Sequence, residues 1–129
     1  MEYVSLLRPD FEAQRNSLIL PMPDLLSILT SNIGKKLTAY VAGVDDVETI
    51  ESWIEGEPVP RDEEDRLWLT YQIVMTLSIA DTPRMAQAWL IGVNPELYDR
   101  VPLRLLREGI LDQVAGQIVG AARAFVAGG

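Results

Sequence analysis

Apolar residues recur at steps of three and four positions along most of this chain, and alternation with period two is nowhere sustained. Steps of three and four place side chains on one face of a helix, whereas a half-buried strand needs period two. After the helix-start signal Pro23-Asp24, the apolar positions are Leu26, Leu29, Ile33, Leu37, Tyr40 and Val41. The last periodic segment carries Leu111, Val114, Ile118, Ala122 and Phe125. The sequence therefore predicts an all-α fold.

Short breaks divide this pattern into separate helices. Ser31-Asn32 is a second start signal inside the first segment, so one long helix and two shorter ones both remain open. Gly43 predicts a left-handed cap, and the aspartates that follow it predict the N-cap of a helix over residues 47–55. Asp62 to Asp65 place four acids in the first turn of the longest helix, where they favour the helix dipole.

With 129 residues, the chain is long enough to bury the core of one domain. We expect three regions: an N-terminal arm over 1–22, a helix-turn-helix-like region over 23–80, and a helical region over 81–129 that ends in a tail. Residues 34–66 hold ten acidic and four basic side chains, which is −6 of the total charge of −8, whereas residues 67–129 are neutral. This change in charge along the chain indicates two functional halves within one small fold.

Composition excludes several classes of site. The chain has no Cys and no His, so disulfides, thiolate metal sites, a Cys nucleophile and a His general base are impossible. No apolar run reaches the roughly 18 residues that a membrane span needs, and the N-terminus lacks the basic region of a signal peptide. We therefore expect a soluble, cytoplasmic protein.

Residues 34–57 have the element lengths of a helix-turn-helix: a helix over 34–42, a turn at Gly43-Val44 and a second helix over 47–55. Two helices that merely pack together are the alternative interpretation. In the motif, the side chains facing DNA would be Glu48, Thr49, Glu51, Ser52 and Glu55. The spacing therefore favours a helix-turn-helix fold. The carboxylates would be repelled by DNA phosphates, however, so the charge disfavours DNA binding.

A DNA-binding autorepressor of its own operon is the alternative function that this motif suggests. The candidate contacts are Lys35, Lys36, Arg8 and Arg15 for phosphates, and Thr49 and Ser52 near bases. Because the chain has few bases, we expect only weak binding of operator DNA by the free protein.

Catalysis and metal binding have little support in the sequence. The acids between Glu55 and Asp65 are explained by a helix N-terminus and a solvated face, and they lack the spacing of a calcium loop. The remaining candidate groups for a small enzyme are Glu96 with Asp99, and Tyr71 or Tyr98. Their spacing shows no pairing, so we expect no catalytic residues, no metal and no cofactor.

A longer motif lies between residues 89 and 109. It consists of Trp89, Asn94-Pro95-Glu96-Leu97, Arg100-Val101-Pro102-Leu103-Arg104-Leu105-Leu106 and Gly109, followed by an Ala-rich final helix. A helix hairpin closed by an Asn-Pro turn would explain it structurally.

The segment also resembles the toxin-binding region of the Xre/MbcA/ParS family of antitoxins, and the stretch from Leu37 to Tyr71 resembles the helix-turn-helix of that family. The similarity spans about residues 32–127. In the family a hydroxyl residue commonly precedes the proline that is Pro102 here, so Val101 lacks a good N-cap, usually worth about 1 kcal/mol.

The resemblance implies a non-catalytic antitoxin whose partner is a RES-domain toxin, an enzyme that degrades NAD. It implies that residues 81–129 bind the toxin and that the tail covers its active-site cleft, although a fraying helix end is the alternative for the tail. The implied contacts are Trp89 and Leu97 as scaffold, Arg100 and Arg104 as polar contacts, and Arg123, Phe125 and Val126 at the cleft. Removal of residues 122–129 is then expected to abolish neutralisation while the fold stays intact. Family members commonly dimerise, and the broad apolar face of the helix over 62–79 also predicts a homodimer.

Overall fold

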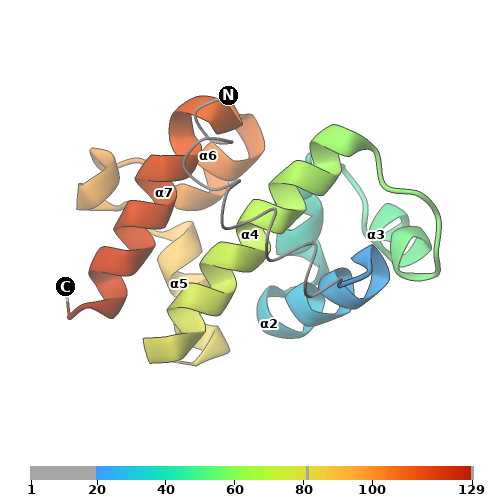
Figure 1. Ribbon diagram of the computed structural model, residues 1–129, viewed down its shortest axis with the longest axis horizontal. Helices are drawn as coiled ribbons and strands as arrows, with labels where there is room; N and C mark the ends of the chain where they lie inside the picture. The colour runs from blue at the N-terminus through green and yellow to red at the C-terminus, as the bar shows by residue number, and fades with distance from the viewer. Residues whose placement is uncertain (1–19, 81, 129) are drawn as a thin grey trace.

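The computed structural model describes residues 20–80 and 82–128. Within these residues the protein consists of six α-helices and one short 3-10 helix, without a strand (Figure 1). The elements are α2 (Met22–Ala42), α3 (Val47–Ile54), α4 (Arg61–Ala80), α5 (Pro83–Ile91), η1 (Pro95–Leu97), α6 (Pro102–Glu108) and α7 (Leu111–Val126). The prediction of an all-α fold is confirmed. Most of the expected N-terminal arm, with Arg8 and Arg15, lies outside the described residues.

Helix α2 is interrupted at Gly34, whose backbone is non-helical with φ 87° and ψ 161°. Two helical segments therefore follow each other, which decides the question that the sequence left open and places the break after Ser31-Asn32. Side chains satisfy carbonyl groups on both sides of the break. The Asn32 amide donates to the Ile28 carbonyl oxygen at 2.8 Å, and the Thr38 hydroxyl donates to the Gly34 carbonyl oxygen at 2.7 Å.

Helix α4 lies at the centre of the molecule and packs against α2, α5, α6 and α7. Its buried residues point to more than one side of the helix. They are Leu67, Trp68, Leu69, Thr70, Ile73, Val74 and Leu77. The broad apolar face, from which the sequence predicts a homodimer, is therefore covered by the chain's own helices. A homodimer therefore stays a prediction, and the apolar face of α4 no longer supports it.

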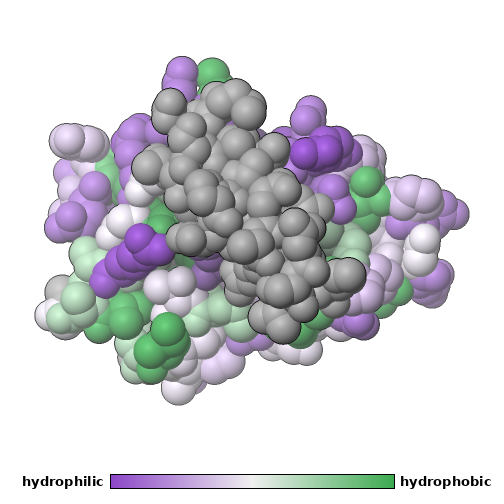
Figure 2. All heavy atoms as spheres, viewed as in Figure 1, coloured by the Kyte–Doolittle hydropathy of each residue, from purple (hydrophilic) through white to green (hydrophobic). Residues whose placement is uncertain are grey.

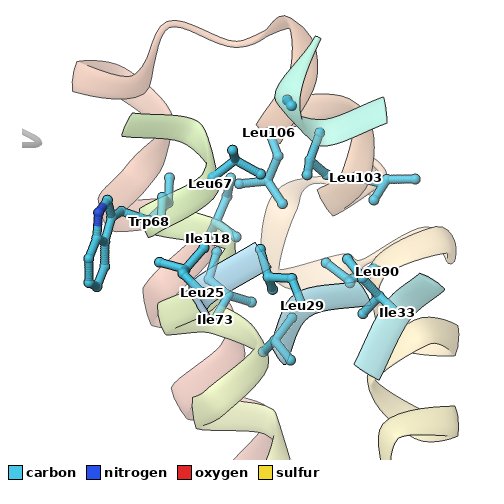
Figure 3. Close-up of a cluster of buried hydrophobic side chains, with 14 of the residues drawn as sticks. Leu25, Leu29, Ile33, Leu67, Trp68, Ile73, Leu90, Leu103, Leu106 and Ile118 are labelled. Atoms are coloured by element: carbon cyan, nitrogen blue, oxygen red, sulfur yellow. The ribbon is translucent and has the colours of Figure 1, made fainter. Parts of the chain in front are cut away.

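A single hydrophobic core joins the two expected halves (Figure 3). It contains Leu25, Leu29 and Ile33 of α2, Leu67 and Ile73 of α4, Leu90 of α5, Leu106 of α6 and Ile118 of α7. Full burial of one such side chain stabilises a fold by about 1.5–3 kcal/mol. Neither the segment over 23–80 nor the segment over 81–129 covers its apolar face without the other.

Candidate functional site

The turn between α2 and α3 has the cap geometry expected from the sequence. Gly43 is left-handed at φ 90°, and its N–H and that of Val44 donate to the last carbonyl groups of α2. Asp46 is the N-cap of α3: its Oδ1 accepts from the Thr49 hydroxyl at 2.7 Å and from the Thr49 N–H at 2.8 Å. These hydrogen bonds hold the pKa of the Asp46 carboxyl below its ordinary value of 3.8.

Two arginines from later helices hold the same turn. Arg66 of α4 donates from Nε and Nη2 to the Ala42 carbonyl oxygen, at 3.2 and 2.6 Å. Arg107 of α6 donates to the Tyr40 carbonyl oxygen at 3.1 Å and to the Asp45 carboxylate at 3.1 Å. Cations suit the carbonyl end of a helix. No local sequence pattern predicts this role for either arginine, because the partners are 24 and 67 residues away in the chain.

Residues predicted to contact DNA are partly engaged within the fold. The ammonium group of Lys35 forms a 2.7 Å ion pair with the carboxylate of Glu51 in α3. The hydroxyl of Thr49 donates a hydrogen bond to the carboxylate of Asp46. Lys36 and Ser52 are exposed. Lys35 pairs with Glu51, but Glu48 of α3 and the C-cap Glu55 are also exposed, so the surface of this helix remains acidic.

A hollow of about 520 Å³ lies between the end of α2, the start of α3 and α6. Its lining carries both signs of charge, from Lys36, Asp45, Asp46, Arg107 and Glu108. Across residues 20–80 and 82–128, no three acidic side chains are grouped so that they could hold a metal ion. Because charges of both signs line it, this hollow favours no single ligand chemistry.

The motif that follows α5 forms a closed loop over residues 94–100. The side-chain Oδ1 of Asn94 accepts from the Glu96 N–H at 2.9 Å, and the backbone carbonyl oxygen of Asn94 accepts from the N–H groups of Leu97 and Asp99 at 2.9 and 2.8 Å. The Asn94 N–H donates to the Arg100 carbonyl oxygen at 3.1 Å, which closes the base of the loop. Leu97 is fully buried, and η1 packs against α7, so this predicted scaffold residue holds the loop against the last helix.

The two predicted polar contacts differ in their surroundings. Arg100 is tied into the fold, because it donates to the Leu97 carbonyl oxygen at 2.7 Å and to Gln117 of α7 at 2.6 Å. Arg104 is exposed and forms a 3.5 Å pair with Glu108. Both arginines line a hollow of about 430 Å³ beside α6. Val101 makes no side-chain cap to α6, as its side chain predicts.

The tail is the last part of α7, which continues to Val126. Trp89 and Phe125 are half-buried and pack against the core, whereas Arg123 is exposed. Ala122 is fully buried. Removal of residues 122–129 would take away the core contacts of Ala122 and Phe125, so we now expect this deletion to lower the stability of the fold as well as to abolish neutralisation.

Several apolar side chains reach the surface of the segment over 82–128. Ile91 is 57%, Val93 70% and Tyr98 84% exposed. In Figure 2, hydrophobic residues also reach the surface near the ends of α4 and α7, whereas the side on which α3 lies is mainly hydrophilic. In the sequence, Tyr98 is a candidate only for catalysis, and its exposure is not evident from the local pattern. The other such tyrosine, Tyr71, packs edge to face on Trp68, with ring centroids 5.7 Å apart.

In the described part of the chain, no helix is both long and apolar enough to cross a membrane. No protein-family model matches the sequence, and no curated protein matches it significantly. One solved structure has a similar fold: a chain of the crystal structure of the M. tuberculosis MbcT-MbcA toxin-antitoxin complex, with a TM-score of 0.63 and 19% sequence identity. The match covers 82% of this chain and 97% of that chain. The protein therefore has the all-α fold of a component of that complex, in agreement with the family resemblance of its sequence.

Proposed function

We propose that this protein is a non-catalytic antitoxin that binds a RES-domain toxin through the segment over residues 81–129 and blocks the toxin's active site. The observation that carries the proposal is the shared fold, which extends over 82% of the chain and thus includes most of its helices. The motif from Trp89 to Gly109, on which the family resemblance rests, folds into the closed loop and α6.

The surface of this segment supports a protein partner. Exposed apolar side chains (Ile91, Val93 and Tyr98) lie in the same segment as the exposed guanidinium groups of Arg104 and Arg123. Aromatic and arginine side chains are enriched at the centres of protein interfaces.

Charge supports the same kind of partner. A pocket that binds NAD must offer positive potential to the diphosphate. The acidic block over residues 34–66 gives this protein a complementary field, which speeds association with such a toxin and selects it over other partners.

Co-expression with the product of the adjoining reading frame tests the proposal. That product alone is expected to deplete cellular NAD and stop growth, and co-expression of this protein is expected to restore both. Purified together, the two proteins are expected to elute as one complex. If the neighbour is toxic and this protein neither binds it nor restores NAD, the proposal is wrong.

A second candidate is the DNA-binding autorepressor, which the arrangement of the 35–42 helical segment, the left-handed Gly43 and α3 favours. The engagement of Lys35 and Thr49 within the fold weighs against strong binding. A gel shift against the promoter of its own operon, with a salt titration, tests it. A dissociation constant no better than about 10⁻⁶ M at physiological salt would be ordinary non-specific binding.

A further inference from the structure

Residues 97–100 form a tight turn with an unusual residue at its first central position. The Arg100 N–H donates to the Leu97 carbonyl oxygen at 3.2 Å, and both central residues have positive φ, 58° at Tyr98 and 65° at Asp99. Turns with two positive φ values are normally built from Asn and Gly. A left-handed conformation costs a residue with a Cβ roughly 1–2 kcal/mol, so tyrosine makes this turn less stable than the usual residues would.

The surroundings hold the turn in this conformation. Leu97 is fully buried on one side of it, and Asn94 accepts three hydrogen bonds from within the loop. On the other side, the side chain of Arg100 is fixed to the Leu97 carbonyl oxygen and to Gln117. A strained conformation persists only where the rest of the structure determines it in this way. The turn is therefore a rigid mount for the side chain of Tyr98.

Within the described residues, the ring of Tyr98 gains a cation–π contact with Arg100 but almost no burial. An exposed contact of this kind contributes about 0.5–1 kcal/mol, less than the roughly 1–2 kcal/mol that the left-handed backbone costs. The side chain of Tyr98 is 84% exposed, the highest value among the large apolar residues of the described part. The guanidinium carbon of Arg100 lies 5.8 Å from the centroid of the Tyr98 ring. Strain and exposure of an aromatic ring at the same residue indicate a contact outside the chain.

The shape and charge of the turn define what it can contact. The segment around residue 97, orange in Figure 1, projects at the edge of the molecule beyond α7. A residue that is 84% exposed leaves a small ligand few contacts with this chain, whereas small-molecule sites enclose most of their ligand, so a protein surface that surrounds the ring is the better partner. Glu96 and Asp99 are exposed neighbours of Tyr98 in the chain, and the guanidinium of Arg100 lies at the ring. Residues 96–100 therefore carry a net charge of −1, which repels the phosphates of nucleic acids or anionic lipids and attracts a basic rim.

We propose that Tyr98 is an anchor that inserts into a pocket of the partner toxin, one with apolar walls and a lysine or arginine at its rim. This inference rests on the proposed antitoxin function and adds the residue that binds and the chemistry of the pocket. A rigid aromatic side chain on a fixed turn loses little conformational entropy on binding, which is typical of interface hot spots.

Substitution of Tyr98 by glycine or asparagine tests the proposal because it separates binding from stability. Both residues suit the left-handed backbone, so Tyr98→Gly and Tyr98→Asn are expected to unfold at higher urea concentration than the wild type. Their affinity for the purified product of the adjoining reading frame, measured by calorimetry, is expected to fall by about 30-fold or more, the loss typical of a hot spot. A gain in stability with a loss of binding would not arise from a structural role.

Ile79→Ala is the matched control, because Ile79 is 78% exposed at the end of α4, away from the turn. It is expected to bind like the wild type. If the wild type binds and both Tyr98 variants bind equally well, the anchor is wrong while the antitoxin function stands. If the wild type does not bind, the antitoxin function is wrong and the anchor with it. Lower stability of both variants would overturn the argument from strain. Dissociation of a homodimer by Tyr98→Gly would identify a second copy, and not a toxin, as the occupant.

Discussion

The guanidinium carbon of Arg107 lies 4.7 Å from the centroid of the Tyr40 ring, and Nη1 of the same side chain donates to the Tyr40 carbonyl oxygen at 3.1 Å. A third contact joins Nη2 to the Asp45 carboxylate at 3.1 Å. One side chain of α6 thus satisfies the carbonyl end of α2 and covers an aromatic ring. It connects the candidate toxin-binding segment to the turn that precedes α3.

Arg107→Ala is expected to lower the free energy of unfolding by about 1–3 kcal/mol, because it removes charge-assisted hydrogen bonds and a cation–π contact. Arg107→Lys is expected to recover little of this, since an ammonium cannot donate in a fork while it covers the ring. Urea unfolding measures both effects. Arg104→Ala is the control: its pair with Glu108 is exposed, so a loss of at most a few tenths of a kcal/mol is expected. Equal losses for Arg104 and Arg107 would contradict this role.

Gly43→Ala is expected to cost about 2–4 kcal/mol. Part of the cost is the left-handed backbone at φ 90°. The rest arises because a Cβ at this position would lie 2.8 Å from Nη2 of Arg66, which would displace the hydrogen bond to the Ala42 carbonyl oxygen. A double-mutant cycle with Arg66→Ala separates the two parts. In that background, Gly43→Ala is expected to cost only the backbone part, whereas strictly additive losses would disprove the clash.

Features that depend on neighbouring residues could be predicted from the sequence. The cap at Gly43, the N-cap at Asp46 and the missing cap at Val101 follow from local backbone chemistry. The turn at Asn94-Pro95 also follows from the sequence, because Asn and Pro favour turns in isolation, but the closure of the loop at Arg100 does not.

Features that depend on distant residues could not be predicted. The roles of Arg66 and Arg107 arise from contacts with α2 that no local pattern encodes. The left-handed backbone of Tyr98 contradicts the preference of tyrosine, because Leu97, Asn94 and Arg100 impose it. The period of the last helix includes Phe125 among its apolar positions, but this local pattern is the same whether the ring packs against the core, as it does here, or binds a partner.

Gly120→Ala is expected to stabilise the protein by about 0.5–1 kcal/mol. Gly120 lies inside α7, where alanine has the higher helix propensity, and a Cβ there would meet no atom within 4 Å. Urea unfolding of the variant and the wild type measures the difference. A loss of stability would mean that the space beside Gly120 is occupied in solution, and the elution volume of both proteins would show whether a second copy occupies it.

Asp46 is expected to make stability depend on pH at the acidic end. Its pKa in the folded protein lies below the ordinary value of 3.8, because Thr49 donates two hydrogen bonds to the carboxylate. A depressed folded pKa contributes stability above pH 3.8, and this contribution is lost as the pH falls through the folded value. Asp46→Asn keeps a cap of similar strength but does not titrate. The stability advantage of the wild type over this variant is therefore expected at pH 7 and absent below the folded pKa. NMR titration of the carboxyl carbon gives that pKa directly, and a value at or above 3.8 would contradict the prediction.

Phe125 has two candidate roles, an anchor in the toxin and a part of the protein's own core, and a substitution separates them. Because the ring is half-buried and packs against the core, Phe125→Ala is expected to lower the free energy of unfolding by about 2 kcal/mol, less than the 3–5 kcal/mol of a fully buried phenylalanine. Arg123→Ala, on the exposed side of the same turn, is the control and is expected to unfold like the wild type. Deletion of residues 127–129 replaces the longer truncation as a test of the tail, because Ala127 and Gly128 are exposed and their loss leaves the core contacts in place. Unchanged stability of Phe125→Ala together with weaker binding of the neighbouring gene's product would instead assign this ring to the toxin.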